Sequence, residues 1–135
     1  MNGNKDSFVK KPNNIIRIPA KNGEFFRLWL QFLLPFHNLT NKEMDVATAF
    51  LKERFELSKV VKDNKILDKV LLGDEYKKKI RDECGLKVPH FQVILSKLRK
   101  EKFVVDDRIN PKFIPNINIE EDPESFKLLL YFDLK

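Results

Sequence analysis

Residues 74–114 read DEYKKKIRDECGLKVPHFQVILSKLRKEKFVVDDRINPKFI, and this stretch decides the fold. Gly85 separates two segments of helical periodicity, and glycine readily adopts the left-handed conformation that ends a helix. With a tight turn at Gly85, apolar side chains fall where two helices joined by such a turn bury residues between them. They are Ile80, Cys84, Leu86, Phe91 and Ile94. The stretch therefore predicts a helix from Asp74, its N-cap, to Cys84, and then a second helix.

The second helix is expected to start near Pro89, because the first helical turn tolerates a residue that lacks an N–H donor. Its predicted buried stripe is Phe91, Ile94, Leu95 and Leu98. The same geometry turns six side chains outward: His90, Gln92, Val93, Ser96, Lys97 and Lys100. A hairpin is predicted to follow, with strands at Phe103–Val105 and Lys112–Ile114 and a loop at Asp106–Pro111.

The preceding segment predicts one more core helix. Thr40 and Glu43 have the spacing of a capping box, and apolar residues follow at helical intervals. This inward stripe is Met44, Val46, Ala47, Phe50, Leu51 and Phe55. Residues 58–73 fit either a continued helix or a short helical turn with a connecting loop.

The apolar run Phe25–Phe36 predicts a buried helix. It is interrupted by Arg27 and Gln31, and its length of about 12 residues falls short of the roughly 20 that a membrane helix needs, so we expect no membrane association. A helix apolar nearly all round needs cover on more than one face. A second subunit would supply that cover through Phe25, Trp29, Phe32 and Phe36.

The two ends of the chain differ in character. Residues 1–14 lack periodic apolar positions and are expected to form a flexible basic arm, and residues 15–135 a single domain. Ile15–Ile18 fits a short strand. Within residues 116–135, Glu120–Glu124 predicts an acidic loop and Phe126–Leu134 a strand, since its apolar residues alternate. That strand would extend the hairpin sheet or pair with another subunit.

Charge is distributed unevenly along the 135 residues, whose net charge is +6. Residues 1–27 hold six basic against two acidic side chains, and residues 87–112 hold seven against three, so each block carries +4. Residues 113–135 carry two basic and five acidic side chains, a net −3. A basic face and an acidic tail are implied.

Residues 76–115, and ILSKLRKEKFVVDDRINPKFIP (94–115) above all, resemble the winged helix-turn-helix superfamily. The similarity is to the winged helices of plasmid and phage replication initiators and of small transcriptional regulators. Arg81 departs from the pattern where a small residue is usual, and Lys102 where glycine precedes the first wing strand. The expected fold is α+β and mainly helical: a winged helix-turn-helix core (74–115), an extra N-terminal hydrophobic helix and a C-terminal strand.

The resemblance implies a protein that binds double-stranded DNA in replication initiation or transcriptional regulation, encoded by a phage or plasmid. If the second helix lies in the major groove, Gln92 and Ser96 are the side chains best suited to form hydrogen bonds with base edges, and His90 lies near the start of that helix. Three basic side chains would reach phosphates: Lys97, Lys100 and Arg108. Asp106 and Asp107 at the tip of the wing are negatively charged, which disfavours docking of the wing in the minor groove of DNA. The alternative is a structural or assembly subunit, for example of a virus particle, that uses the winged helix for protein contacts.

Nothing in the sequence predicts an enzyme. The two histidines, His37 and His90, lie far apart in the sequence, and with a single cysteine they provide no metal-ligand spacing and no cysteine–histidine pair. The four glycines match no phosphate loop. We therefore expect no catalytic residue, metal or cofactor. The single cysteine favours a reducing, cytoplasmic location, or the virion if the alternative holds.

Overall fold

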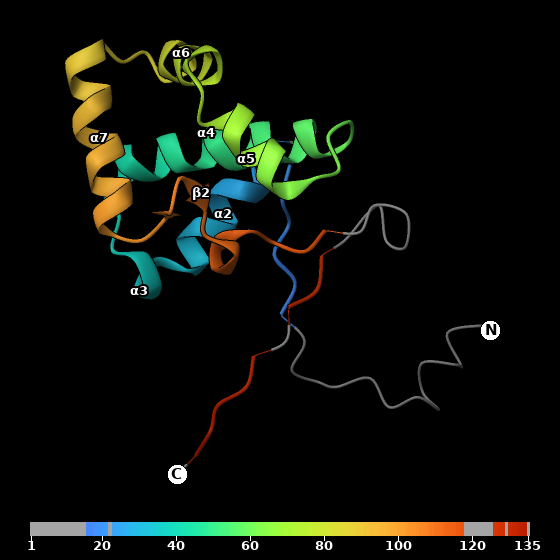
Figure 1. Ribbon diagram of the computed structural model, residues 1–135. Helices are drawn as coiled ribbons and strands as arrows, with labels where there is room; N and C mark the ends of the chain where they lie inside the picture. Colours follow the sequence, from blue (N-terminus) through green and yellow to red (C-terminus); the bar gives the residue numbers. More distant parts are fainter. Residues whose placement is uncertain (1–15, 22, 118–125, 129, 135) are drawn as a thin grey trace.

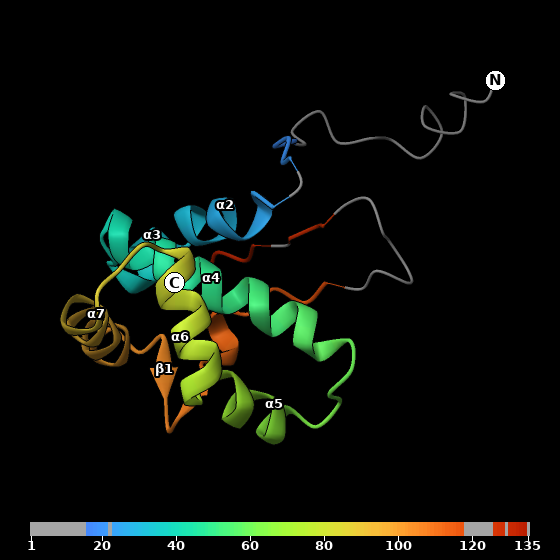
Figure 2. The same ribbon diagram turned by 90° about the horizontal axis from the view of Figure 1, so that it is seen from above.

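Helix α4 (Asn41–Ser58) runs through the middle of the molecule and contacts four other helices, α2, α5, α6 and α7 (Figure 1). The computed structural model describes residues 16–21, 23–117, 126–128 and 130–134. Its other helices are α2 (Phe25–Phe32), α3 (Leu34–His37), α5 (Asn64–Leu71), α6 (Asp74–Glu83) and α7 (Val88–Lys100). From above, α6 lies over α4, with α7 to one side (Figure 2).

The fold is mainly helical with one small antiparallel sheet, which agrees with the expected α+β class. Strands β1 (Val104–Val105) and β2 (Arg108–Ile109) form that sheet, and a 3-10 helix, η1 (Pro111–Phe113), follows. The predicted basic arm 1–14 and the acidic loop Glu120–Glu124 lie outside the described residues.

The capping box at the start of α4 is confirmed. The Thr40 hydroxyl accepts a hydrogen bond from the Glu43 backbone N–H at 3.3 Å, and the Glu43 carboxylate accepts one from the Thr40 N–H at 2.9 Å. Of the predicted stripe, all but the half-buried Phe55 lie in the core. Residues 58–73 resolve into the end of α4, a loop and α5, where Asp63 caps the first turn.

The apolar run 25–36 was expected to form one helix, but it is split at Leu33 into α2 and α3. Pro35 explains the break, because it lacks an N–H and its ring would clash with the Gln31 carbonyl in a continuous helix. Trp29 is buried and donates its indole N–H to the Phe113 carbonyl at 2.8 Å, so its expected place in a subunit interface is wrong. Phe25 is half-buried against Phe126.

The turn between α6 and α7 forms as predicted. Gly85 has φ +66°, and the Leu86 N–H bonds to the Arg81 carbonyl at 3.0 Å, which is the Schellman pattern. The N-cap of α6 is Gly73 rather than Asp74, and the helix ends one residue earlier than expected, at Glu83.

Helix α7 ends in a second Schellman motif, with Lys102 in the glycine position. Lys102 has φ +67°, and the Phe103 N–H bonds to the Leu98 carbonyl at 2.9 Å. The departure from the winged-helix pattern at Lys102 is thus accommodated by a non-glycine turn. A lysine in this conformation is strained, because its Cβ approaches the carbonyl oxygen.

The hairpin is shorter than the sequence predicted. Val104 pairs with Ile109 and Val105 with Arg108, so only Asp106 and Asp107 form the turn. Both aspartates have positive φ, as a type I′ turn requires. The expected strand at Lys112–Ile114 is wrong, since Pro111 starts η1 and the Asn110 side chain caps it.

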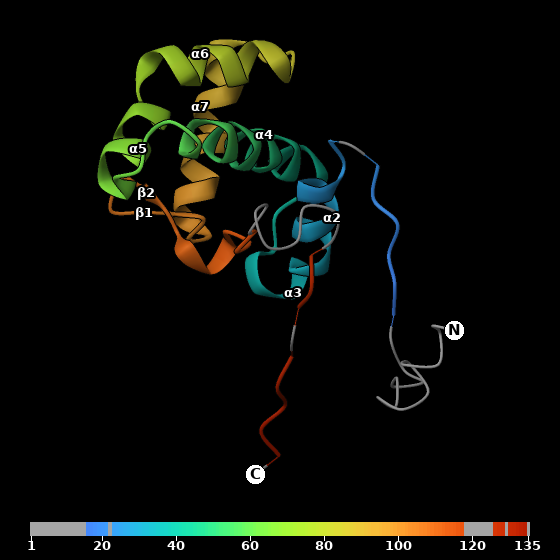
Figure 3. The same ribbon diagram turned by 90° about the vertical axis from the view of Figure 1, so that its right-hand side faces the viewer.

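Two other expected strands are absent from the described residues. Ile16–Ile18 is exposed and unpaired with any strand, and so are Leu128 and Leu130–Leu134. Phe126 packs against Trp29 with ring centroids 5.5 Å apart, but the segment beyond it extends away from the helices (Figures 1 and 3).

Asp68 joins three parts of the fold although it is only 1% exposed. Its carboxylate accepts a hydrogen bond from Arg54 Nε of α4 at 2.9 Å and another from Arg108 Nε of β2 at 3.3 Å. Arg108 was expected in a wing loop that reaches DNA phosphates, but it lies in β2 and pairs with Asp68. A buried carboxylate is tolerable only with such partners.

We expect Asp68→Ala to lower the free energy of unfolding by about 3–5 kcal/mol, because it leaves the largely buried Arg54 without its counterion. Arg108→Gln should cost about 1 kcal/mol or less, since the Arg108 side chain is 41% exposed. Urea unfolding followed by circular dichroism measures both. A loss below 1 kcal/mol for Asp68→Ala would show that the carboxylate is not structurally important.

Lys102→Gly should raise the free energy of unfolding by about 0.5–1 kcal/mol, because glycine removes the left-handed strain but gains freedom in the unfolded chain. Lys102→Ala is the control: it removes the same charge and keeps a Cβ. Equal effects of the two substitutions would assign any gain to charge rather than to backbone strain.

Candidate nucleic-acid interface

The outward surface of α7 forms the first part of the candidate site. Four buried residues fix the rotation of the helix about its axis, as predicted: Phe91, Ile94, Leu95 and Leu98. The opposite side chains are therefore held in solvent. We call this exposed surface, made of His90, Gln92, Val93, Ser96, Arg99 and Lys100, the α7 face.

The chemistry of the α7 face changes along the helix. The hydrogen-bonding side chains His90, Gln92 and Ser96 come before the last turn, which carries Lys97, Arg99 and Lys100. No carboxylate lies between Val88 and Lys100. Val93, 66% exposed, adds an apolar contact in the middle. This combination suits a ligand that offers hydrogen-bonding groups next to a row of negatively charged groups.

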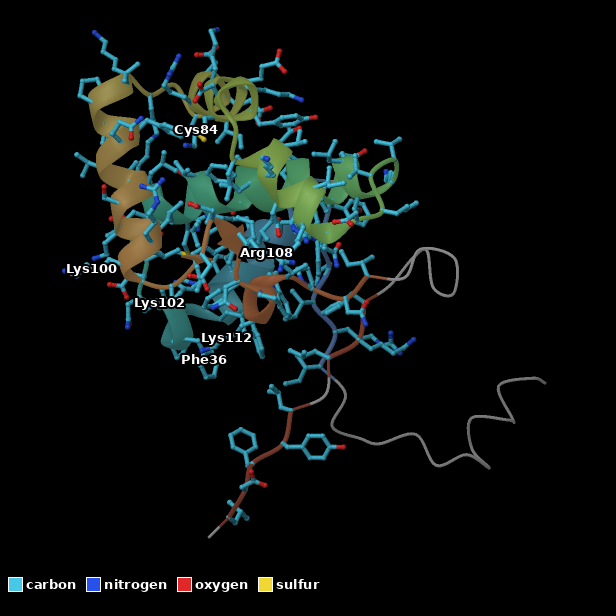
Figure 4. The ribbon with its side chains drawn as sticks, viewed as in Figure 1. Phe36, Cys84, Lys100, Lys102, Arg108 and Lys112 are labelled. Carbon is cyan, nitrogen blue, oxygen red and sulfur yellow. The ribbon has the colours of Figure 1, made fainter. Side chains whose placement is uncertain are left out.

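The structure brings four of the six predicted site residues together on this face: His90, Gln92, Ser96 and Lys100. Lys97 lies at its edge, with a side chain 33% exposed and its amine 3.7 Å from the Glu101 carboxylate. Arg108 does not join them, since it points to Asp68 on α5, and Figure 4 places it well away from Lys100.

Three residues were missed as members of a site: Lys102, which follows the end of α7, and Lys112 and Phe36, which lie close to each other (Figure 4). The Lys112 amine lies 5.6 Å from the centre of the Phe36 ring. Sequence spacing assigned Lys112 to a strand and Phe36 to a subunit interface. The Asn110–Pro111 pair is typical of a capped turn, and it is the sequence signal that could have placed Lys112 in a turn rather than in a strand.

Three titratable side chains outside the α7 face, Cys84, Glu83 and Lys79, have shifted pKa values. Desolvation raises the pKa of the half-buried Cys84 thiol, so the reactive thiolate is disfavoured. Desolvation and then the neighbouring Glu53 raise the pKa of Glu83, and Glu53 raises the pKa of Lys79 through a hydrogen bond. Over the described ranges, no three His, Cys, Asp or Glu side chains are grouped to hold a metal ion.

Comparison with protein-family models, curated proteins and solved structures gives no match to this chain. Among the helices in the described residues, none combines the length and the apolar character needed to cross a bilayer.

Proposed function

We propose that this chain is a winged-helix protein that binds double-stranded DNA through the α7 face. The observation that carries the proposal is the carboxylate-free α7, whose exposed His90, Gln92 and Ser96 precede a last turn that carries basic side chains. The role that fits is replication initiation or transcriptional regulation, in a phage or plasmid, without catalysis or a cofactor.

The order of elements supports a winged-helix assignment. Core helix α4 precedes α6, the Gly85 turn, α7 and the two-stranded hairpin, as in a helix-turn-helix followed by one wing. Helix α5 and the α2–α3 pair are additions to that arrangement. In such proteins the second helix of the motif enters the major groove with its N-terminal residues at the base edges.

Side-chain chemistry supports the same orientation. With α7 in the groove, Gln92 and Ser96 would form hydrogen bonds with base edges, and Val93 would contact a thymine methyl group. Arg99 and Lys100 would neutralise phosphates. The hairpin contributes little, because Asp106 and Asp107 at its tip repel phosphates and Arg108 is already paired.

We expect the protein to bind a random 20-base-pair duplex, with an affinity that falls roughly 40- to 150-fold between 50 and 200 mM salt, because about three or four phosphate contacts release counterions. Arg99→Glu/Lys100→Glu should weaken binding at least tenfold at 50 mM salt, as measured by fluorescence anisotropy.

Lys65→Glu/Lys69→Glu is the matched control, since it makes the same charge change on the exposed surface of α5. If the two double variants lose affinity equally, the attraction is general and not located on α7. Absence of binding by the unaltered protein at 50 mM salt would overturn the proposal.

A second candidate function is that of a structural subunit in a larger assembly, such as a virus particle. The exposed apolar side chains of the last described segment favour it, with Tyr131, Phe132 and Leu134 each at least 80% exposed.

If that segment joins subunits, sedimentation velocity should detect dimers or larger species, and Tyr131→Ser/Phe132→Ser should convert them to monomers. A monomer at about 100 μM of the unaltered chain would contradict self-assembly.

A further inference from the structure

Outside the α7 face, an exposed aromatic ring, that of Phe36, lies beneath the amine of Lys112. The surface around this ring combines Phe36 of α3, Lys102 after α7 and Lys112 of η1, and Lys100 connects it to the α7 face (Figure 4). We call Phe36, Lys102 and Lys112 the end surface. Duplex binding by α7 does not require the Phe36 ring, so the end surface needs a separate explanation.

The Asn110 side chain holds the two lysine-bearing segments together. Its amide donates a hydrogen bond to the Lys102 carbonyl at 2.9 Å, and its oxygen accepts one from the Lys112 backbone N–H at 3.0 Å. The Asn110 N–H also bonds to the Phe103 carbonyl at 2.8 Å. The backbones that carry both amines are therefore fixed relative to each other.

Phe36 is presented by an equally well-fixed segment. The next residue, His37, is buried, with Nε2 2.7 Å from the Leu30 carbonyl and Nδ1 accepting a hydrogen bond from the Leu39 N–H at 2.9 Å. Asn38 then ends α3 in the left-handed conformation. These contacts hold the Phe36 ring outward, where it is 57% exposed.

The charges around the ring are available to a ligand. Within the described ranges, no Asp or Glu oxygen lies within 4.0 Å of the Lys102 or Lys112 amine. The Lys112 amine lies over the Phe36 ring at 5.6 Å and over Phe113 at the same distance. An aromatic face beside ammonium groups suits a ligand that is both flat and anionic.

We propose that the end surface binds single-stranded nucleic acid, with one unpaired base stacked on Phe36 and the flanking phosphates at Lys102 and Lys112. The bases of a duplex are stacked on one another and offer no free face to the ring, whereas an unpaired strand exposes one on every nucleotide. This inference goes beyond duplex binding and does not depend on it.

The test measures the fluorescence anisotropy of labelled dT12, rU12 and an abasic 12-nucleotide strand with the full chain at 50 mM salt. We expect dT12 to bind more tightly than the abasic strand, because only dT12 can stack. Phe36→Leu should weaken dT12 binding about five- to hundredfold and leave the abasic strand unaffected. We expect rU12 to bind about as tightly as dT12, because stacking on Phe36 and phosphate contacts do not involve the sugar.

Phe32→Leu is the matched control, because Phe32 is also exposed, on α2, and no lysine amine lies over it in the described part of the chain. Phe36→Trp keeps a ring and should retain dT12 binding, which separates stacking from any loss of fold. Lys112→Gln should weaken both dT12 and the abasic strand.

Three results would overturn the inference: no dT12 binding, equal affinity for dT12 and the abasic strand, or equal losses for Phe36→Leu and Phe32→Leu. Duplex binding is scored separately with Arg99→Glu/Lys100→Glu, so the two proposals can fail independently.

Discussion

The arrangement of the hairpin depends on the buried carboxylate of Asp68, held between Arg54 and Arg108. The three side chains come from α4, α5 and β2, so one charged cluster sets where the hairpin leaves the helices. Because β1 begins only a few residues after α7, the cluster also constrains the end of that helix. Removing the Asp68 carboxylate would leave the largely buried Arg54 without a counterion, whereas removing Arg108 would leave the Arg54–Asp68 pair in place, so Asp68 is the central member of the cluster.

This constraint determines which surfaces remain for binding. Arg108 is committed to Asp68, and the hairpin tip carries two carboxylates, so the hairpin is unsuited to phosphate contact. Lys97, Arg99 and Lys100 in the last turn of α7, and Lys102 and Lys112 beyond it, lie outside the cluster. The α7 face and the end surface therefore adjoin each other, and both depend on how α7 is packed.

Local sequence signals predicted the local structure. The Thr40 capping box, the Gly85 turn and the buried stripe of α7 depend on residues within a few positions of each other, and all are present. Distant pairings could not be foreseen: Trp29 bonds to Phe113, and Arg108 to Asp68. The alternating residues 126–134 satisfy the strand pattern, but a strand also needs a neighbour, and the described residues supply none.

The most direct test of the account is a map of backbone amide chemical shifts, recorded by NMR on isotopically labelled protein as a 20-base-pair duplex is added at 50 mM salt. If DNA binds to the α7 face, the largest changes will fall between Val88 and Lys100, with little change at the hairpin tip or on α5. Changes centred on Asp106–Asp107 or on α5, with α7 unaffected, would contradict it.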